Sequence, residues 1–206
     1  MTKYALNNEL NSYRKLSKSR VYWNTDILTK NNTTKGFDQV NYKDYVHDKK
    51  VLEKAMLSIY KYGAVIVNGV AKDPKEMVNL CKPIGAIQPT VFGDNYCVVT
   101  NKSEQFSDRA YTNLSLRAHT DNVYLKNNSG LECFHIISKP KYGGDSLFVD
   151  GFYCAQILKK LYKEDYDFLS KTHVEFEFSK EGEFSHKIFD KHITENPINN
   201  ELYQIR

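Results

Sequence analysis

The sequence predicts an α+β fold, in which strands predominate from Tyr96 onward and helices flank them. Two observations support this prediction. Apolar residues recur at helical spacing between residues 49 and 62. From Tyr96 onward, short runs rich in Val, Ile, Phe and Leu are separated by Gly or by Asn and Ser clusters, which is typical of strands joined by turns. The 206 residues are enough for one domain, or for part of one, with a sizeable core.

The clearest helix is predicted over Lys49–Tyr62. Asp48 can cap its start and Gly63 can end it. The apolar stripe of this helix consists of Val51, Leu52, Ala55, Met56, Ile59 and Tyr60. Further helices are predicted from Asp73-Pro74-Lys75-Glu76 to near Pro83, over Phe152–Tyr162 with Asp150 near the start, and over Asp165–Lys171.

Strands are predicted wherever β-branched and aromatic residues cluster between turn signals. A short buried strand follows the first helix at Ala64–Val67. The others are Tyr96–Thr100, Ser115–Asp121, Gly130–Ser138, Asp145–Asp150, His173–Phe178, Phe184–Phe189 and Glu201–Arg206. The segment Trp23–Tyr45 is predicted to be irregular around its Asn- and Thr-rich middle.

Composition excludes several classes of function. The net charge of +4 comes from interspersed charges, whereas a nucleic-acid interface needs a clustered basic face. No apolar run approaches the roughly 20 residues of a membrane span. Cys81, Cys97, Cys133 and Cys154 show no metal-ligand spacing, so we expect buried free thiols and a reducing compartment.

The residues that suggest chemistry are His119 and Asp121. In an extended segment, side chains two positions apart project to the same face, so an imidazole and a carboxylate would lie side by side. These are two of the three ligands in the 2-His-1-carboxylate set that binds non-haem Fe(II) with open coordination positions. We therefore predict that His119 and Asp121 are catalytic metal ligands.

Several motifs in a fixed order surround this pair. They are Ala110-Tyr111-Thr112, His119-Thr120-Asp121, the stretch Gly130 to His135, Gly143-Gly144-Asp145-Ser146-Leu147-Phe148-Val149-Asp150-Gly151-Phe152 and the ending Glu201-Leu202-Tyr203-Gln204-Ile205-Arg206. In these motifs, from about Trp23 onward, the chain resembles the family of trimethyllysine dioxygenase and γ-butyrobetaine hydroxylase. These are Fe(II)- and 2-oxoglutarate-dependent oxygenases of carnitine biosynthesis. Within the family, the motifs of this chain resemble the trimethyllysine enzyme more closely than the γ-butyrobetaine enzyme.

The resemblance implies a double-stranded β-helix, or jelly roll, with flanking helices and an incomplete C-terminal half. Residues 1–21 are expected to be a polar lead-in, and residues 22–206 part of a TauD-like catalytic domain. The implied reaction is hydroxylation of trimethyllysine with Fe(II), 2-oxoglutarate as co-substrate and ascorbate as reductant. γ-Butyrobetaine is the alternative substrate.

The resemblance also assigns residues to ligands. Asp108 and Phe134 are expected beside the co-substrate. Phe92, Tyr96 and Tyr111 are expected to form an aromatic cage around the quaternary ammonium group of the substrate, which cannot donate a hydrogen bond. With 15 Tyr and 11 Phe in the chain, each of these aromatics has core packing as its alternative role.

The family's distal His and its 2-oxoglutarate-binding Arg lie in motifs that do not occur after Asp121 here. His135 is expected to pack rather than ligate, and His173, His186 and His192 are expected to be solvated. The 206-residue chain is thus expected to be a catalytically silent part of such an enzyme. A non-enzymatic module that binds methylammonium groups is a third hypothesis.

The expected partner is a small quaternary ammonium compound, without nucleic acid or membrane. The resemblance implies a homodimer in many relatives. The expected location is the cytoplasm, with mitochondria as the alternative, because residues 1–20 lack the apolar segment of a signal peptide and contain Glu9.

Overall fold

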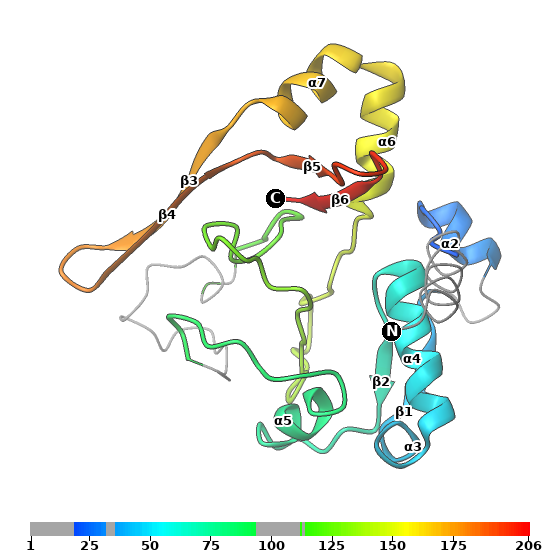
Figure 1. Ribbon diagram of the computed structural model, residues 1–206. Coiled ribbons are helices and arrows are strands. Elements are labelled where there is room, and N and C mark those ends of the chain that lie inside the picture. Colours follow the sequence, from blue (N-terminus) through cyan, green and yellow to red (C-terminus); the bar gives the residue numbers. More distant parts are fainter. Residues whose placement is uncertain (1–18, 32–35, 94–111, 113) are drawn as a thin grey trace, which may run out of the picture. The chain divides into compact units, whose positions relative to one another are not determined.

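The computed structural model describes residues 19–31, 36–93, 112 and 114–206, and the chain divides into two compact units, residues 1–70 and 71–206. Helices and strands are interspersed along the first unit, whereas in the second unit the helices precede the strands (Figure 1). In the described residues the sheets are three pairs, β1–β2, β3–β4 and β5–β6, so the α+β class is observed. No helix in the described part of the chain is long and apolar enough to cross a membrane.

The described residues of the first unit form two short strands and three helices. In chain order they are α2 (Thr25–Asn31), β1 (Gln39–Asn41), α3 (Tyr42–His47), α4 (Lys49–Tyr62) and β2 (Ile66–Asn68). β1 and β2 are parallel, with Val40 opposite Val67. The predicted strand Ala64–Val67 is therefore present, displaced by up to two residues, but the prediction that it is buried is wrong, since Ile66 is 42% exposed. α2, β1 and α3 were not predicted, because short elements carry little periodicity.

The boundaries of α4 agree with the prediction. The Asp48 carboxylate accepts a hydrogen bond from the backbone N–H of Lys50 at 2.8 Å, which satisfies one of the free donors of the first turn. At the other end, Gly63 has φ of 84°, and its N–H donates to the carbonyl of Ile59. A residue without Cβ adopts this left-handed conformation at no steric cost, so the helix ends there.

The core of the first unit forms around Trp23. Its ring contacts Phe37 edge to face, with centroids 5.3 Å apart. Its indole N–H donates to the carbonyl of Tyr62 at 2.8 Å, so the polar atom of this buried side chain has a partner. Ser58, also buried, donates to the carbonyl of Ala64 at 2.9 Å and ties α4 to the segment before β2.

The second unit has helices α5 (Glu76–Cys81), α6 (Gly151–Leu161) and α7 (Lys163–Lys171). Asp150 caps α6 by accepting from the N–H of Tyr153 at 3.1 Å. The predictions for α6 and α7 are confirmed within two residues. α5 begins later than expected, because residues 74 and 75 form a turn instead of the first helical turn.

Two hairpins follow α7 in the described part of this unit (Figure 1). β3 (Val174–Lys180) pairs with β4 (Phe184–Asp190), and β5 (Ile193–Glu195) pairs with β6 (Leu202–Ile205), both antiparallel. α6 and α7 pack against the second hairpin through the buried cluster of Ala155, Tyr166 and Ile193. β3, β4 and β6 confirm predicted strands, whereas β5 was not predicted.

Other predicted strands are wrong. Residues 115–121, 130–138 and 145–150 belong to no hydrogen-bonded ladder in the structure, and Tyr96–Thr100 lies outside the described residues. Their apolar side chains are exposed, for example Phe134 at 72% and Leu147 at 82%. β propensity reflects how a side chain fits a pleated, half-buried surface, and it supplies no partner strand. In the described residues the sheets do not close into a barrel.

The prediction of buried thiols is also wrong in part. Cys133 and Cys154 are exposed, and Cys81 is partly buried. All three are free thiols, whereas Cys97 lies outside the described residues.

Candidate metal site

His119 and Asp121 face each other in the second unit. Nε2 of His119 lies 3.3 Å from Oδ1 of Asp121. The two side chains are 49% and 44% exposed, so solvent reaches both. The segment is not part of a sheet, yet it places the two side chains on the same side, as expected for an extended stretch.

One hydrogen bond of His119 indicates which of its ring nitrogens carries a hydrogen in the neutral imidazole. Nδ1 lies 2.6 Å from the carbonyl oxygen of Arg117, which can only accept, so Nδ1 carries a hydrogen. In the neutral imidazole, Nε2 then presents a lone pair toward the Asp121 carboxylate. Two such acceptors attract each other only through a proton or a cation between them.

This donor set fits a divalent metal. Two ligands that are each about 2.1 Å from one ion and adjacent in its coordination shell lie about 3 Å apart, close to the 3.3 Å between Nε2 and Oδ1. An imidazole nitrogen and a carboxylate oxygen are ligands of non-haem Fe(II). Across the described residues, however, no three His, Cys, Asp or Glu side chains are grouped so that they could hold a metal ion.

All six histidines fall within the described residues, so their positions can be compared. None of the other five completes a three-ligand group with His119 and Asp121 there. His173 is exposed, as expected. His186 and His192 are half-buried instead, because they contact the rings of Tyr124 and Phe184 and the ring of Phe176.

Glu132 is a third acidic group beside the pair, and sequence analysis did not identify it. The pKa of Glu132 is raised to about 7, first because burial of its carboxyl end penalises the charged form. A hydrogen bond to Asp121 and the charge of Asp121 contribute to this rise, while His119 opposes it. Glu132 is 11 positions from Asp121 in the sequence, so no local spacing could have indicated this contact.

The chain turns immediately after Asp121. Asn122 adopts φ of 57°, a conformation that Asn tolerates better than most residues, and its carbonyl accepts from the N–H of Leu125 at 2.9 Å. The side chain of Asn122 donates to Ser129 at 3.1 Å and accepts from the Tyr124 hydroxyl at 2.9 Å. We call residues 122–129 the site turn.

Aromatic side chains gather between the site turn and the first hairpin. Phe178 of β3 is stacked on Tyr124 at 4.9 Å and contacts Phe92 at 5.7 Å. Phe184 and His186 of β4 extend the group. Of the predicted cage, Phe92 is thus part of an aromatic cluster, while Tyr96 and Tyr111 lie outside the described residues. Asp108, which was expected beside the co-substrate, also lies outside the described residues. Phe134, expected at the same place, is largely exposed.

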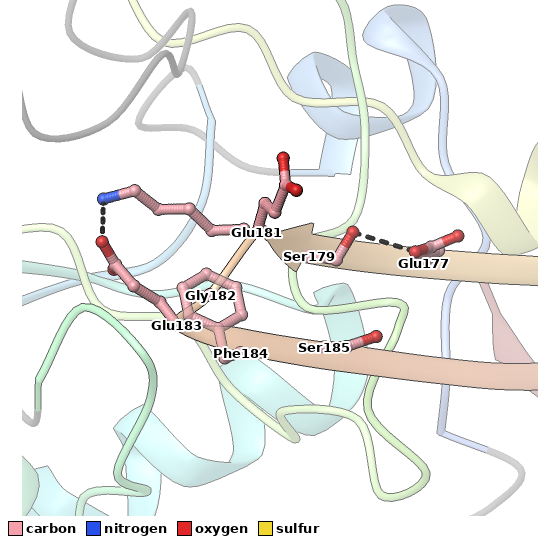
Figure 2. A pocket seen from close by; sticks show the side chains of 8 residues that line it. Glu177, Ser179, Glu181, Gly182, Glu183, Phe184 and Ser185 are labelled. Carbon is pink, nitrogen blue, oxygen red and sulfur yellow. Dashed lines mark hydrogen bonds and ion pairs between the residues drawn. The ribbon is translucent and has the colours of Figure 1, made fainter.

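Surface hollows lined by described residues of this unit include these two. One is lined by Ser115, Leu116, Arg117, Ala118 and His119, and so lies beside the pair of His119 and Asp121. The other lies at the tip of the β3–β4 hairpin (Figure 2). There Lys180 pairs with Glu183 at 2.6 Å and Ser179 donates to Glu177 at 2.9 Å, so these side chains already satisfy one another.

Comparison with known proteins identifies the family. The profile of the taurine catabolism dioxygenase TauD, TfdA family matches residues 28–201. The chain belongs to this family. The matched residues lie in both units, and they include His119, Asp121 and the site turn.

Individual relatives within this family are named as oxygenases. A trimethyllysine dioxygenase of Meyerozyma guilliermondii is 36% identical over 118 residues, which is 57% of this chain and 29% of the relative. The human mitochondrial trimethyllysine dioxygenase is 29% identical over 214 residues, covering 100% of this chain and 49% of the relative. Human gamma-butyrobetaine dioxygenase is 30% identical over 155 residues, or 75% and 38% of the two chains.

The chain therefore spans about half the length, or less, of the curated relatives it matches.

Proposed function

We propose that this chain carries part of the active site of an Fe(II)- and 2-oxoglutarate-dependent dioxygenase that hydroxylates trimethyllysine. The observation that carries the proposal is the facing pair of His119 and Asp121, 3.3 Å apart and open to solvent. Family membership supports the reaction class, and the trimethyllysine dioxygenases among its relatives support the substrate. Under this proposal, residues 22–206 are part of one catalytic domain whose complete fold is the jelly roll.

In this site, His119 and Asp121 would hold the iron from one side. The carbonyl of Arg117 keeps the hydrogen on Nδ1 of His119, so the lone pair of Nε2 is available to the metal. Bound iron, with 2-oxoglutarate, would supply the oxidation itself, and the protein would supply binding and orientation. The described residues group no third His, Cys, Asp or Glu ligand with this pair.

Substrate orientation is assigned to the aromatic residues. Phe92, Tyr96 and Tyr111 would surround the trimethylammonium group, and Asp108 and Phe134 would lie beside the co-substrate. The contact of Phe92 with Phe178 supports an aromatic surface in this part of the second unit. Fixing the cationic end of the substrate would determine which carbon approaches the metal.

The second candidate substrate is γ-butyrobetaine, which is favoured by the 30% identity with the human gamma-butyrobetaine dioxygenase. Both substrates carry a quaternary ammonium group, so they predict the same cage and differ at the other end of the molecule. Ascorbate as reductant, a homodimer and a cytoplasmic or mitochondrial location belong to the same proposal; bovine and human relatives are named mitochondrial.

The experiment measures metal binding first and turnover second. Under anaerobic conditions, the 206-residue chain is titrated with Co²⁺, an optical probe for this kind of site. His119→Ala should weaken binding at least about tenfold, because it removes one of two ligands. His173→Ala removes an exposed histidine outside the pair and should leave binding unchanged.

Turnover is measured as succinate release with trimethyllysine or γ-butyrobetaine. A chain extended to the full length of the relatives should release succinate with one of them. The 206-residue chain alone should release little, because the described residues offer two metal ligands and no three-ligand group. Equal Co²⁺ affinity of the wild type and His119→Ala, or an extended enzyme that is inactive with both substrates, would refute the proposed function.

A further inference from the structure

The side chain of Arg206 is buried against the site turn, with 2% of its area exposed. The C-terminal end of β6 lies beside this loop (Figure 1). The guanidinium group donates to four oxygens of the turn and pairs with one carboxylate. Its acceptors are Val123 O at 2.8 Å, Leu125 O at 3.0 Å, Asn128 Oδ1 at 2.9 Å, Lys126 O at 3.3 Å and Asp190 Oδ2 at 3.0 Å.

Arg206 is itself fixed from the opposite side, independently of the turn. Its backbone N–H donates to the carbonyl of His192 at 2.9 Å, so it continues the pairing of the β5–β6 hairpin. The carboxylate of Asp190, at the end of β4, forms an ion pair with the guanidinium of Arg206. The Phe176 ring of β3 lies 6.0 Å from the guanidinium carbon. Arg206 thus links two hairpins to the turn, the β3–β4 hairpin through its guanidinium and the β5–β6 hairpin through its backbone.

This arrangement requires arginine. A buried charge is costly unless it is paired and hydrogen-bonded, and here one carboxylate and four neutral oxygens surround it. The planar fork reaches several acceptors at once, whereas the ammonium of lysine is a single point with three donors. The backbone carbonyls of residues 123, 125 and 126 would in turn lose their partner without it.

The turn begins at the residue after Asp121, and the first carbonyl that Arg206 holds is two residues from that carboxylate. We propose that Arg206 is a positioning residue, which anchors the site turn and thereby keeps Asp121 facing His119 for metal binding. Only the second part of this proposal, the effect on metal binding, rests on the proposed function. The anchoring of the turn can be tested without metal.

The first measurement is hydrogen exchange of the metal-free chain, resolved to residues 119–129. Arg206→Met keeps an unbranched apolar stem but removes every donor, and Arg206→Lys keeps the charge. Both should accelerate exchange in the site turn at least tenfold. The control is Tyr166→Phe, which weakens the core of the same unit without touching the turn.

The second measurement is Co²⁺ affinity. Loss of a group that orients a metal ligand typically weakens binding about 10- to 100-fold. We expect a loss in this range for Arg206→Met, a smaller loss for Arg206→Lys, and wild-type affinity for Tyr166→Phe. If Arg206→Met does not fold, as judged by circular dichroism, Arg206→Lys decides.

The outcomes separate the two proposals. Unchanged exchange in residues 122–129 of the folded Arg206 variants overturns the anchoring, and faster exchange with wild-type Co²⁺ affinity overturns the link to the metal. If wild type and His119→Ala bind Co²⁺ equally, the proposed function fails together with that link. The exchange measurement still decides the anchoring in that case.

Discussion

The most direct test of the second unit's core is the substitution Tyr166→Phe. Tyr166 is 2% exposed, and its hydroxyl donates to Oε1 of Glu195 at 2.5 Å. Lys159 donates to the same oxygen at 2.7 Å, and its ammonium lies 4.8 Å from the centre of the Tyr166 ring. Together these contacts join α6, α7 and β5.

The expected loss follows from what the substitution removes. The phenylalanine ring fills the same space, so no cavity forms. A hydrogen bond to a charged acceptor contributes about 1.5–3 kcal/mol. Because Lys159 still pairs with the carboxylate, we expect the lower end, a loss of about 1.5 kcal/mol in the free energy of unfolding of this unit. This corresponds to roughly a tenfold change in the unfolding equilibrium.

The loss should depend on pH with a defined sign. The hydrogen bond from Lys159, and then that from Tyr166, lowers the pKa of Glu195 below its ordinary value of 4.5. A carboxylate with a lowered pKa stabilises the folded state fully above its unfolded pKa, and this contribution is lost as pH falls through the folded pKa. The difference between wild type and Tyr166→Phe should be constant near neutral pH and shrink below about pH 4.5.

The assay is urea unfolding combined with hydrogen exchange of residues 151–205 across this pH range. The matched control is Tyr203→Phe, which removes a hydroxyl from a side chain that is 69% exposed, and should change stability by less than about 0.5 kcal/mol. Two results would refute the reasoning: a Tyr166→Phe loss as small as that of the control at pH 7, or a loss that grows as the pH is lowered.

Three further predictions concern helix ends and one buried hydroxyl. Gly63→Ala should destabilise the first unit by about 1–2 kcal/mol, because a Cβ is strained at φ of 84° although nothing lies within 4 Å of it; urea unfolding followed by fluorescence of Trp23, the chain's single tryptophan, measures this loss. Asp150→Ala removes the cap of α6 and should cost about 1 kcal/mol, seen as faster hydrogen exchange in the first turn of that helix. Ser58→Ala leaves the carbonyl of Ala64 without its 2.9 Å donor and should cost about 1–2 kcal/mol in the same fluorescence assay.

Each of these has a clear contrary result. Gly85 also has open space at its Cβ position but lies outside the left-handed region, so Gly85→Ala is the control for Gly63→Ala. Equal effects of the two substitutions would contradict the strain argument. Unchanged hydrogen exchange at the start of α6 in Asp150→Ala would contradict the capping role of Asp150. Wild-type stability of Ser58→Ala would contradict the stabilising role of the Ser58 hydroxyl.

Helix termini were predictable because they depend on neighbouring residues alone. The carboxylates of Asp48 and Asp150 reach backbone N–H groups two and three positions away, and Gly63 ends α4 by its own conformation. The two strands β3 and β4 were also predicted, from their own composition, and the structure pairs them across a short turn around Gly182.

The strands predicted over residues 115–150 were wrong for the opposite reason. A strand needs a partner, and the composition of a segment does not specify which distant segment will supply one. Core packing shows the same limit: Ser58 was not in the predicted stripe of α4, yet it is 1% exposed because Ala64 accepts its hydrogen bond.

At the candidate metal site, the sequence alone determined the pair. His119 and Asp121 are two positions apart, so chain geometry by itself brings them together. Tertiary structure alone decided what surrounds them: Glu132 beside Asp121 and Arg206 on the site turn, with more than 75 residues of chain between Arg206 and each of its acceptors there. Short-range contacts follow from backbone geometry, whereas contacts over such separations exist only because packing of the hairpins brings the segments together.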